Sequence, residues 1–229
     1  MYLISHAHRF IFVHNPKSGG TSVFQALRQH ADWVCRQPEK TYLRLRAALL
    51  FRESYQLSLF QPHVPARRLR RKLPTTVWDD FYKFGIVRHP CGWLWSYWKY
   101  VRQRPKHPEY QHFAPFDDFR KLVEALDVRA LPIRPQSYYL TDDSGHILVD
   151  RVGHLERIQE DFTAIRNKIG LPEVELQHHN RTGNRRETWQ MVYDDYMRER
   201  VGRFLRRDFE IFGYDPFRDS PTQNATDYR

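Results

Sequence analysis

A short basic, glycine-rich segment follows an apolar run near the N-terminus, and its residue types suit the binding of a phosphate-like anion. Lys17 precedes Gly19 and Gly20, and the hydroxyl residues Thr21 and Ser22 come directly after them. The lysine supplies positive charge, the glycines allow the main chain to approach closely, and the hydroxyls can donate hydrogen bonds. Backbone N–H groups at the start of a following helix would point at the same anion.

The position of the lysine distinguishes this segment from the loop that binds nucleoside triphosphates. In that loop, G-x-x-x-x-G-K-[ST], the lysine follows the glycines, whereas Lys17 precedes them. The ligand is therefore expected to carry phosphate, but it need not be ATP. Ser18 lies between the lysine and the glycines and belongs to the same set of candidate binding residues. The alternative for the whole segment is an ordinary connection between a strand and a helix.

Arg88 and Ser96 form a second candidate anion site. Lys83–Arg88 has the pattern of a buried strand, and Pro90 suits the first position of a helix that carries Ser96. Arginine can bind a terminal phosphate through two parallel hydrogen bonds. Ligands of open α/β sheets collect at the carboxyl ends of strands, where Arg88 is expected. Two such sites predict a nucleotide with phosphates at two different positions.

Alternating strand and helix patterns surround these residues. Phe10–Val13 reads as a buried strand, and a helix is expected from Thr21 to about His30. Three apolar stripes with helical spacing are expected in the core, the last of them in one long helix: Phe116, Phe119, Val123 and Leu126; Ile158, Phe162, Ile165 and Ile169; Tyr193, Met197, Val201 and Phe204. The predicted fold class is α/β, a P-loop-like three-layer fold with a central, mostly parallel sheet flanked by helices.

The composition fits a folded domain with anionic ligands. The 229 residues are 41% hydrophobic and 15% aromatic, which argues against a disordered chain. A net charge of +10 fits a phosphorylated nucleotide, an acidic glycan, nucleic acid or a membrane surface. We expect a single domain over residues 1–217 and a polar tail over residues 218–229. Cys35 and Cys91 are too few for a disulfide framework and fit a reducing compartment.

Beyond these patterns, the sequence resembles the carbohydrate-type, family 2-like sulfotransferases, in the branch with small bacterial members. Residues 16–22 resemble the loop that binds the 5′-phosphosulfate in these enzymes. Residues 87–97 resemble their 3′-phosphate motif, R-x-P with a serine eight residues after the arginine. Later family segments resemble residues 135–140, 147–150, 179–182 and 207–214, so that the likeness covers about residues 9–215 in order.

The resemblance implies transfer of a sulfuryl group from 3′-phosphoadenosine 5′-phosphosulfate (PAPS) to an acceptor hydroxyl, on a carbohydrate or glycolipid, with adenosine 3′,5′-bisphosphate as product. Lys17 would stabilise charge on the leaving 5′-phosphate. The other residues implied in donor binding are Ser18, Gly19, Gly20, Thr21 and Ser22 at that phosphate, and Arg88 and Ser96 at the 3′-phosphate. No metal is expected, because cationic side chains and amides can carry the charge.

The resemblance also points to His63 as the base that takes the acceptor's proton. Residues 63–70 resemble a histidine-bearing segment of the family, and a neutral imidazole suits proton abstraction. The alternative is a structural or substrate-orienting role. His14 and His89 flank the two phosphate motifs, and their positions favour loop structure. The basic run Arg67–Lys72 is expected either as a solvated helix face or as a rim that attracts an anionic acceptor.

Two other functions compete with sulfuryl transfer. A basic nucleic-acid-binding module would explain the charge but not Arg88 with Ser96, and no nucleic-acid partner is expected. A phosphate-loop kinase would explain the first segment only, and it needs Mg²⁺-binding carboxylates that the pattern does not identify. No signal peptide is visible, and no apolar run approaches the ~18 residues that span a bilayer. A cytoplasmic enzyme of bacterial type is therefore expected.

Overall fold

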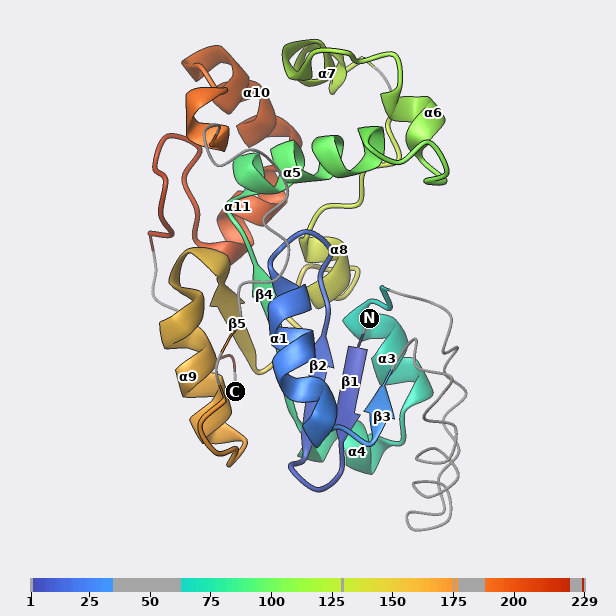
Figure 1. Cartoon of the computed structure of the whole chain (residues 1–229), viewed down its shortest axis with the longest axis vertical. Helices are drawn as coiled ribbons and strands as arrows, with labels where there is room; N and C mark the ends of the chain where they lie inside the picture. The colour runs from blue at the N-terminus through green and yellow to red at the C-terminus, as the bar shows by residue number, and fades with distance from the viewer. Residues whose placement is uncertain are drawn as a thin grey trace. The chain divides into compact units, whose positions relative to one another are not determined.

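The computed structural model of the chain describes residues 2–34, 63–128, 130–174, 176, 188–222 and 228 (Figure 1). These residues belong to two compact units. Unit 1 takes the described parts of residues 1–87, 137–180 and 225–229, and unit 2 takes those of residues 88–136 and 181–224. A single domain over residues 1–217, followed by a polar tail, stays a prediction.

A five-stranded sheet lies at the centre of unit 1, in the order β3-β1-β2-β4-β5. Its strands are β1 (Tyr2–Ser5), β2 (Phe10–Val13), β3 (Trp33–Val34), β4 (Tyr82–Val87) and β5 (Arg151–His154). β2, β4 and β5 pair in parallel, whereas β1 runs antiparallel to both β2 and β3. The mostly parallel sheet is therefore confirmed.

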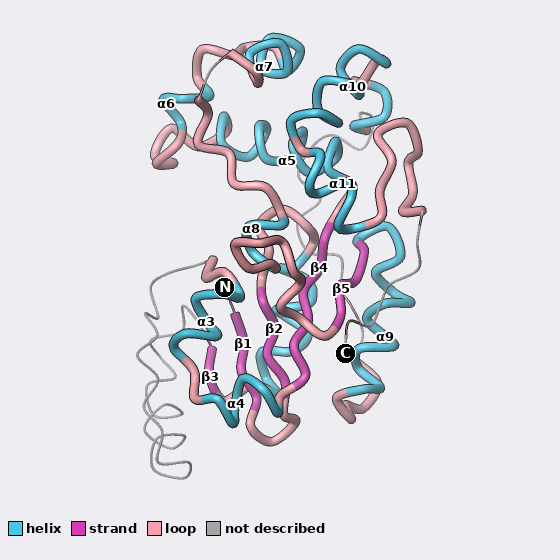
Figure 2. The backbone as a smooth tube through the Cα atoms, turned by 180° about the vertical axis from the view of Figure 1, so that it is seen from behind, coloured by secondary structure: helices cyan, strands magenta, loops and turns pink. Residues whose placement is uncertain are grey.

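Helices cover both faces of this sheet (Figures 1 and 2). One face carries α1 (Gly20–Leu27) and α9 (Ile158–Lys168), and the other carries α3 (Ala66–Lys72), α4 (Thr75–Asp80) and α8 (Ser137–Leu140). Short 3₁₀ turns follow α1 at Arg28–His30 and precede α9 at Leu155–Arg157. This arrangement confirms the predicted three-layer fold, and the helix expected from Thr21 to His30 is present as α1 and its 3₁₀ turn.

The core of unit 1 is built from the apolar runs of the strands and the apolar stripes of α1 and α9. Phe10, Phe12 and Phe84 project from β2 and β4 and are fully buried. Leu27 of α1 and Ile165 of α9 pack in the same cluster. Strands buried on both faces read as continuous apolar runs, which is why Phe10–Val13 was recognisable from its sequence.

Unit 2 consists of helices: α5 (Pro90–Arg102), α6 (Tyr110–Phe113), α7 (Phe119–Ala125), the 3₁₀ turn η4 (Trp189–Met191), α10 (Asp195–Phe204) and α11 (Arg206–Phe212). Pro90 begins α5 as predicted, and the Asp118 side chain caps α7 by accepting a hydrogen bond from the N–H of Arg120. None of the helices in the described ranges is long and apolar enough to cross a membrane.

The C-terminal helix expected from the stripe of Tyr193, Met197, Val201 and Phe204 is present as α10, which begins at Asp195 and ends at Phe204. A break at Leu205 (φ −103°, ψ 24°) separates it from α11, which was not predicted. Leu205 is buried at the break, whereas Phe204 is only half-buried. The break changes which residues face inward, and it brings the carboxylate of Asp208 into the interior of unit 2.

Candidate functional site

The loop between β2 and α1 has the tightly turned backbone that its sequence suggested. Lys17 and Gly19 both adopt positive φ, 63° and 78° respectively. The Ser18 hydroxyl is buried and donates to the carbonyl oxygen of Asn15 at 2.8 Å. The loop therefore folds back on itself between Asn15 and Gly19, and Lys17 stands at its half-exposed turn.

The N-terminus of α1 suits an anion. Its N-cap is Gly19, no side chain caps it, and its first turn contains no acidic residue. The first N–H groups of a helix carry partial positive charge, which a nearby carboxylate would neutralise. Thr21 and Ser22 are half-buried in this first turn. The electrostatics at this helix end therefore favour a bound anion.

Packing against the protein's own side chains explains both glycines of the loop. A Cβ on Gly19 would lie 2.4 Å from Cδ1 of Leu155, and a Cβ on Gly20 would lie 2.7 Å from Cδ2 of His14. Gly19 also needs its left-handed backbone conformation. The glycines thus let the loop and α1 lie close to Leu155 and His14, a requirement that holds with or without a ligand.

Asn15 ties the loop to the neighbouring strand. Its side chain is fully buried, and its Nδ2 donates to the carbonyl oxygen of Ile86 at 3.2 Å. Ile86 lies on β4, so the loop after β2 is anchored beyond the last residue of β2 that pairs with β4. An apolar residue at this position could not make this bond.

His63 contacts His14, a partner that the sequence did not indicate. The two Nδ1 atoms are 3.0 Å apart, and the rings stack with centroids 4.9 Å apart. His63 Nδ1 also lies 3.4 Å from the carbonyl oxygen of His14. Burial, with a further contribution from nearby His63, holds the pKa of His14 well below its usual value. His14 is therefore neutral, and His63 is half-exposed at the end of β2.

Within unit 2, the backbone of Arg88 is held by Gln136. The N–H of Arg88 donates to Oε1 of Gln136 at 2.9 Å, and Nε2 of Gln136 donates to the carbonyl oxygen of Arg88 at 2.7 Å. The N–H of Gln136 in turn donates to the buried carboxylate of Asp208 at 2.7 Å. The amide therefore pairs with Arg88 as a neighbouring strand would, and Asp208 fixes the amide.

The side chain of Arg88 lies over the first turn of α5. A Cβ on Gly92 would lie 3.0 Å from Nε of Arg88 and 2.9 Å from Nε1 of Trp189. Gly92 and Ser96 are four residues apart in α5, so they follow one another along one side of the helix, and the Arg88 side chain lies against Gly92. Ser96 is buried, with 8% of its surface exposed. Gly92 lies between Arg88 and Ser96 in the sequence, and a glycine there leaves room for the Arg88 side chain. This signal was present in the sequence but was not used to predict the site.

His89 has the structural role that its position favoured. Its Nδ1 accepts a hydrogen bond from the N–H of Cys91 at 3.2 Å and so caps α5. Its Nε2 lies 3.1 Å from the carbonyl oxygen of Asp215, and its ring stacks on Trp189. These contacts fix the turn between Arg88 and α5.

The predicted site residues are thus distributed over both units. The loop residues and His63 belong to unit 1, whereas Arg88 and Ser96 belong to unit 2. In the basic run of α3, Arg67 lies over the ring of Tyr138, donates to its carbonyl oxygen and pairs with Asp143, while Arg68, Arg70 and Arg71 are exposed. The predictions for Cys35 and for residues 179–182 lie outside the described residues.

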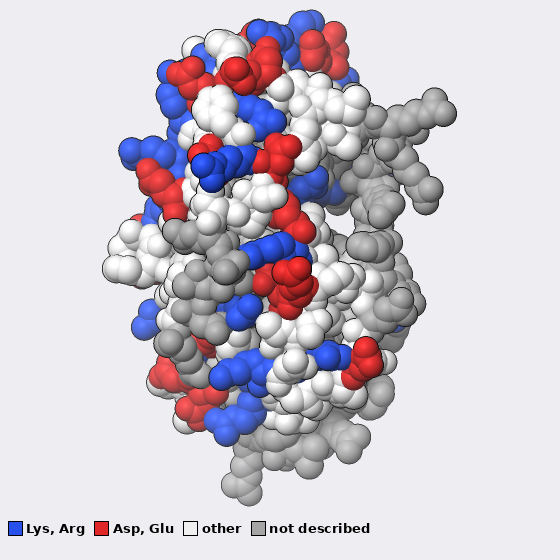
Figure 3. All heavy atoms as spheres, turned by 90° about the vertical axis from the view of Figure 1, so that its left-hand side faces the viewer, with Lys and Arg blue, Asp and Glu red and all other residues white. Residues whose placement is uncertain are grey.

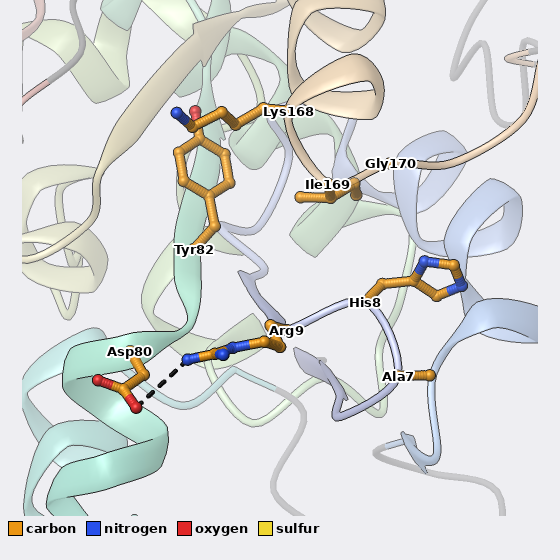
Figure 4. A pocket seen from close by; sticks show the side chains of 8 residues that line it. All are labelled: Ala7, His8, Arg9, Asp80, Tyr82, Lys168, Ile169 and Gly170. Atoms are coloured by element: carbon orange, nitrogen blue, oxygen red, sulfur yellow. Dashed lines mark ion pairs between the residues drawn. The ribbon is translucent and has the colours of Figure 1, made fainter.

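In the described part of the chain, neither the charges on the face shown in Figure 3 nor the hollow shown in Figure 4 forms a second candidate site. On the face shown in Figure 3, the described Lys and Arg side chains alternate with Asp and Glu. A shallow hollow of about 510 Å³ is lined by residues that include Arg9, Tyr82 and Lys168, with Arg9 paired to Asp80 (Figure 4). Arg9 precedes β2 and Tyr82 begins β4, so this hollow lies at the opposite end of these strands from the loop. Within the described ranges, no cluster of three His, Cys, Asp or Glu residues could hold a metal ion.

Comparison with known proteins agrees with the resemblance seen in the motifs. The family model described as "Sulfotransferase family" matches residues 1–215, which include the loop, His63, Arg88 and Ser96. A search of curated proteins found no match. Because the match extends over most of the chain, this protein belongs to the sulfotransferase family.

Proposed function

We propose that this sulfotransferase moves a sulfuryl group from PAPS to a hydroxyl group of a carbohydrate or glycolipid and releases adenosine 3′,5′-bisphosphate. Family membership supports sulfuryl transfer in general. The observation that best supports PAPS as the donor is the N-terminus of α1. This helix end has no side-chain cap and no acidic residue in its first turn, and it follows a loop with Lys17 at its turn. Such an end favours a bound anion such as a phosphate group.

Each unit contributes residues suited to one phosphate of the donor. In unit 1, the 5′-phosphosulfate binds to Lys17 and to the groups at the start of α1, namely Ser18, Gly19, Gly20, Thr21 and Ser22. The Ser18 hydroxyl already donates to Asn15, so its main-chain N–H is the group available for this role. In unit 2, Arg88 and Ser96 bind the 3′-phosphate. The two hydrogen bonds between the Gln136 side-chain amide and the Arg88 main chain hold the Arg88 backbone in place.

The reaction needs a base for the acceptor and positive charge for the leaving group. His63 takes the proton of the acceptor hydroxyl as the acceptor oxygen forms its bond to sulfur. The bond from sulfur to the bridging phosphate oxygen breaks, and Lys17 stabilises the negative charge that develops on that oxygen. The half-exposed ring of His63 is compatible with a base that meets an incoming acceptor.

Thermal unfolding with different nucleotides tests the choice of donor. Adenosine 3′,5′-bisphosphate at about 100 times its Kd is expected to stabilise the protein by about 2.7 kcal/mol, a rise of roughly 5–10 °C in Tm. AMP and ATP at the same concentration are expected to do less, because neither carries a 3′-phosphate. Selective stabilisation by ATP with Mg²⁺ would instead support the kinase alternative.

Two alanine variants separate the proposed roles. Lys17→Ala is expected to lower turnover strongly, since a lost charge-stabilising group commonly costs about 10²–10³-fold in kcat. Arg88→Ala is expected to weaken adenosine 3′,5′-bisphosphate more than AMP, because only the former has the phosphate that Arg88 binds. Normal turnover of the first variant, or an equal loss for both nucleotides in the second, would contradict the assignment.

A further inference from the structure

The contact between His14 and His63 constrains which nitrogen of each ring carries a proton. His63 Nδ1 faces two groups, His14 Nδ1 at 3.0 Å and the His14 carbonyl oxygen at 3.4 Å. A carbonyl oxygen can only accept, so a proton on His63 Nδ1 satisfies both neighbours, whereas a lone pair there would face the lone pairs of the oxygen. His63 Nδ1–H therefore donates to His14 Nδ1, and His63 Nε2 carries the lone pair.

The surroundings of His14 keep it in the accepting role. Its ring is buried between α1 and β2, with the position of a Gly20 Cβ only 2.7 Å from Cδ2 and with Phe12 in edge-to-face contact. The low pKa that burial causes keeps the ring neutral, so that it accepts from His63 and does not repel it as a cation. The ring can neither move away nor take up a charge without disturbing the start of α1.

This arrangement is not optimal for stability. Within the described residues, Nε2 of His14 is buried and has no hydrogen-bond partner. A ring that accepts at Nδ1 carries its own proton on Nε2, so a buried N–H group stays unsatisfied. Unsatisfied buried polar groups are rare in native proteins, and an arrangement that serves function is one reason for which they are kept.

We propose that His14 is a positioning residue that holds His63 with its proton on Nδ1, so that Nε2 is the atom that takes the proton of the acceptor hydroxyl. This inference rests on the proposed function of His63 as base. It assigns a role to a histidine whose sequence position favoured loop structure alone. It also gives Gly20 a second role, because the absence of a Cβ is what lets α1 hold the His14 ring.

The tautomer of His63 can be measured without any acceptor. Long-range ¹H–¹⁵N correlation spectra of the full chain, labelled at histidine nitrogens, distinguish a protonated ring nitrogen from one with a lone pair. The wild type is expected to show His63 protonated at Nδ1 at neutral pH. His63→Ala identifies the signals. A wild-type ring protonated at Nε2 alone would overturn the inference.

Two variants of His14 separate positioning from packing. His14→Phe keeps a ring but removes the acceptor, whereas the amide of His14→Asn places an acceptor near the position of Nδ1. The Phe variant is expected to lose the Nδ1–H preference of His63, and the Asn variant to retain it. His6→Asn is the matched control, because His6 bonds to Asp32 beyond the other end of β2 and is not a predicted site residue.

Turnover with PAPS and a panel of sugar acceptors provides the second readout. The Phe variant is expected to lose about 10- to 100-fold in kcat, as when the partners of metal-bound histidines are removed. Its KM for PAPS and its affinity for adenosine 3′,5′-bisphosphate are expected to stay unchanged, and the Asn variant to recover most of the kcat. Equal kcat losses in the Phe and Asn variants would indicate packing and overturn the inference.

Failure of the base assignment gives a different result from failure of the positioning role. Normal turnover in His63→Ala removes His63 as base, whatever its tautomer. An inactive His63→Ala together with an unchanged His63 tautomer in His14→Phe leaves the base in place and removes the role of His14. If the Phe variant does not fold, the wild-type and His14→Asn spectra still decide, because the inference requires Nδ1–H in both.

Discussion

Gly92 determines whether the Arg88 side chain can lie along α5. Gly92→Ala would place a methyl group 2.9 Å from the Trp189 ring, closer than real Cβ atoms approach, and 3.0 Å from Nε of Arg88, which is a tight contact. Either the guanidinium or the indole must move. We expect the affinity for adenosine 3′,5′-bisphosphate, measured by titration calorimetry, to fall by about tenfold, which corresponds to about 1.4 kcal/mol. The affinity for AMP is expected to change little.

The matched control for this substitution is Gly202→Ala on α10. Gly202 is also a crowded helical glycine of unit 2, since a Cβ there would lie 2.8 Å from Cγ of Pro216. It contacts no predicted site residue in the described structure. A similar loss of affinity in both variants would mean that the Gly92 effect comes from general strain and not from Arg88.

The residues proposed for the chemistry were predicted from the sequence, but the residues that hold them in the structure were not. Lys17 and Gly19 lie in one short segment of the chain, and the spacing from Arg88 to Ser96 is local. The residues that orient them are remote: Gln136 lies 48 positions from Arg88, and His63 lies 49 positions from His14. Such pairs depend on how strands and helices are brought together, and a single sequence shows no local pattern for them.

The N-terminus of α1, where we propose that the 5′-phosphosulfate binds, has no acidic residue in its first turn. An acidic residue in the first turn would interact favourably with the helix dipole. Ser22→Asp is therefore expected to stabilise the protein by about 0.3–1 kcal/mol in chemical denaturation. The same carboxylate would repel a bound phosphate, so we expect adenosine 3′,5′-bisphosphate to bind at least about tenfold more weakly.

Gln25→Asp separates the effect of position from that of charge. Gln25 lies in α1 about one turn beyond Ser22, so the substitution adds the same charge away from the first N–H groups. It is expected to give neither the gain in stability nor the full loss of binding. Tighter nucleotide binding by Ser22→Asp would show that the anion site is elsewhere.

At the level of elements, the sequence predicted the strands and helix starts that the spacing of apolar residues and the positions of proline indicate. Phe10–Val13 was recovered as β2, and Pro90 begins α5 as expected. The strands β1 and β3 were missed, since β3 has only two residues and β1 pairs antiparallel outside the alternating pattern. The predicted stripe ends at Phe204 and gave no sign of α11 after the break at Leu205, because the burial of Leu205 and Asp208 is set by tertiary packing.

For the whole molecule, the buried neutral ring of His14 makes stability depend on pH. The neighbours of this ring include Phe12, Gly20 and His63, and of these three only His63 titrates. The folded state holds the pKa of His14 below its value of about 6.5 in the unfolded chain. Below that pH the unfolded chain therefore binds more protons than the folded protein, and the unfolding free energy falls as the pH is lowered.

We expect this single group to contribute a slope of up to about 1.4 kcal/mol per pH unit below about pH 6.5 and none well above it. His14→Phe removes the titrating ring, so its unfolding free energy should fall less between about pH 7 and pH 5 than that of the wild type, in denaturant titrations at fixed m. Phe12→Leu is the control, because it destabilises the same cluster without removing a titrating group and should shift the whole curve downward in parallel. If the His14→Phe curve is also parallel to that of the wild type, burial does not keep His14 neutral. The inference that Nδ1 of His14 accepts a hydrogen bond from His63 then loses its physical basis.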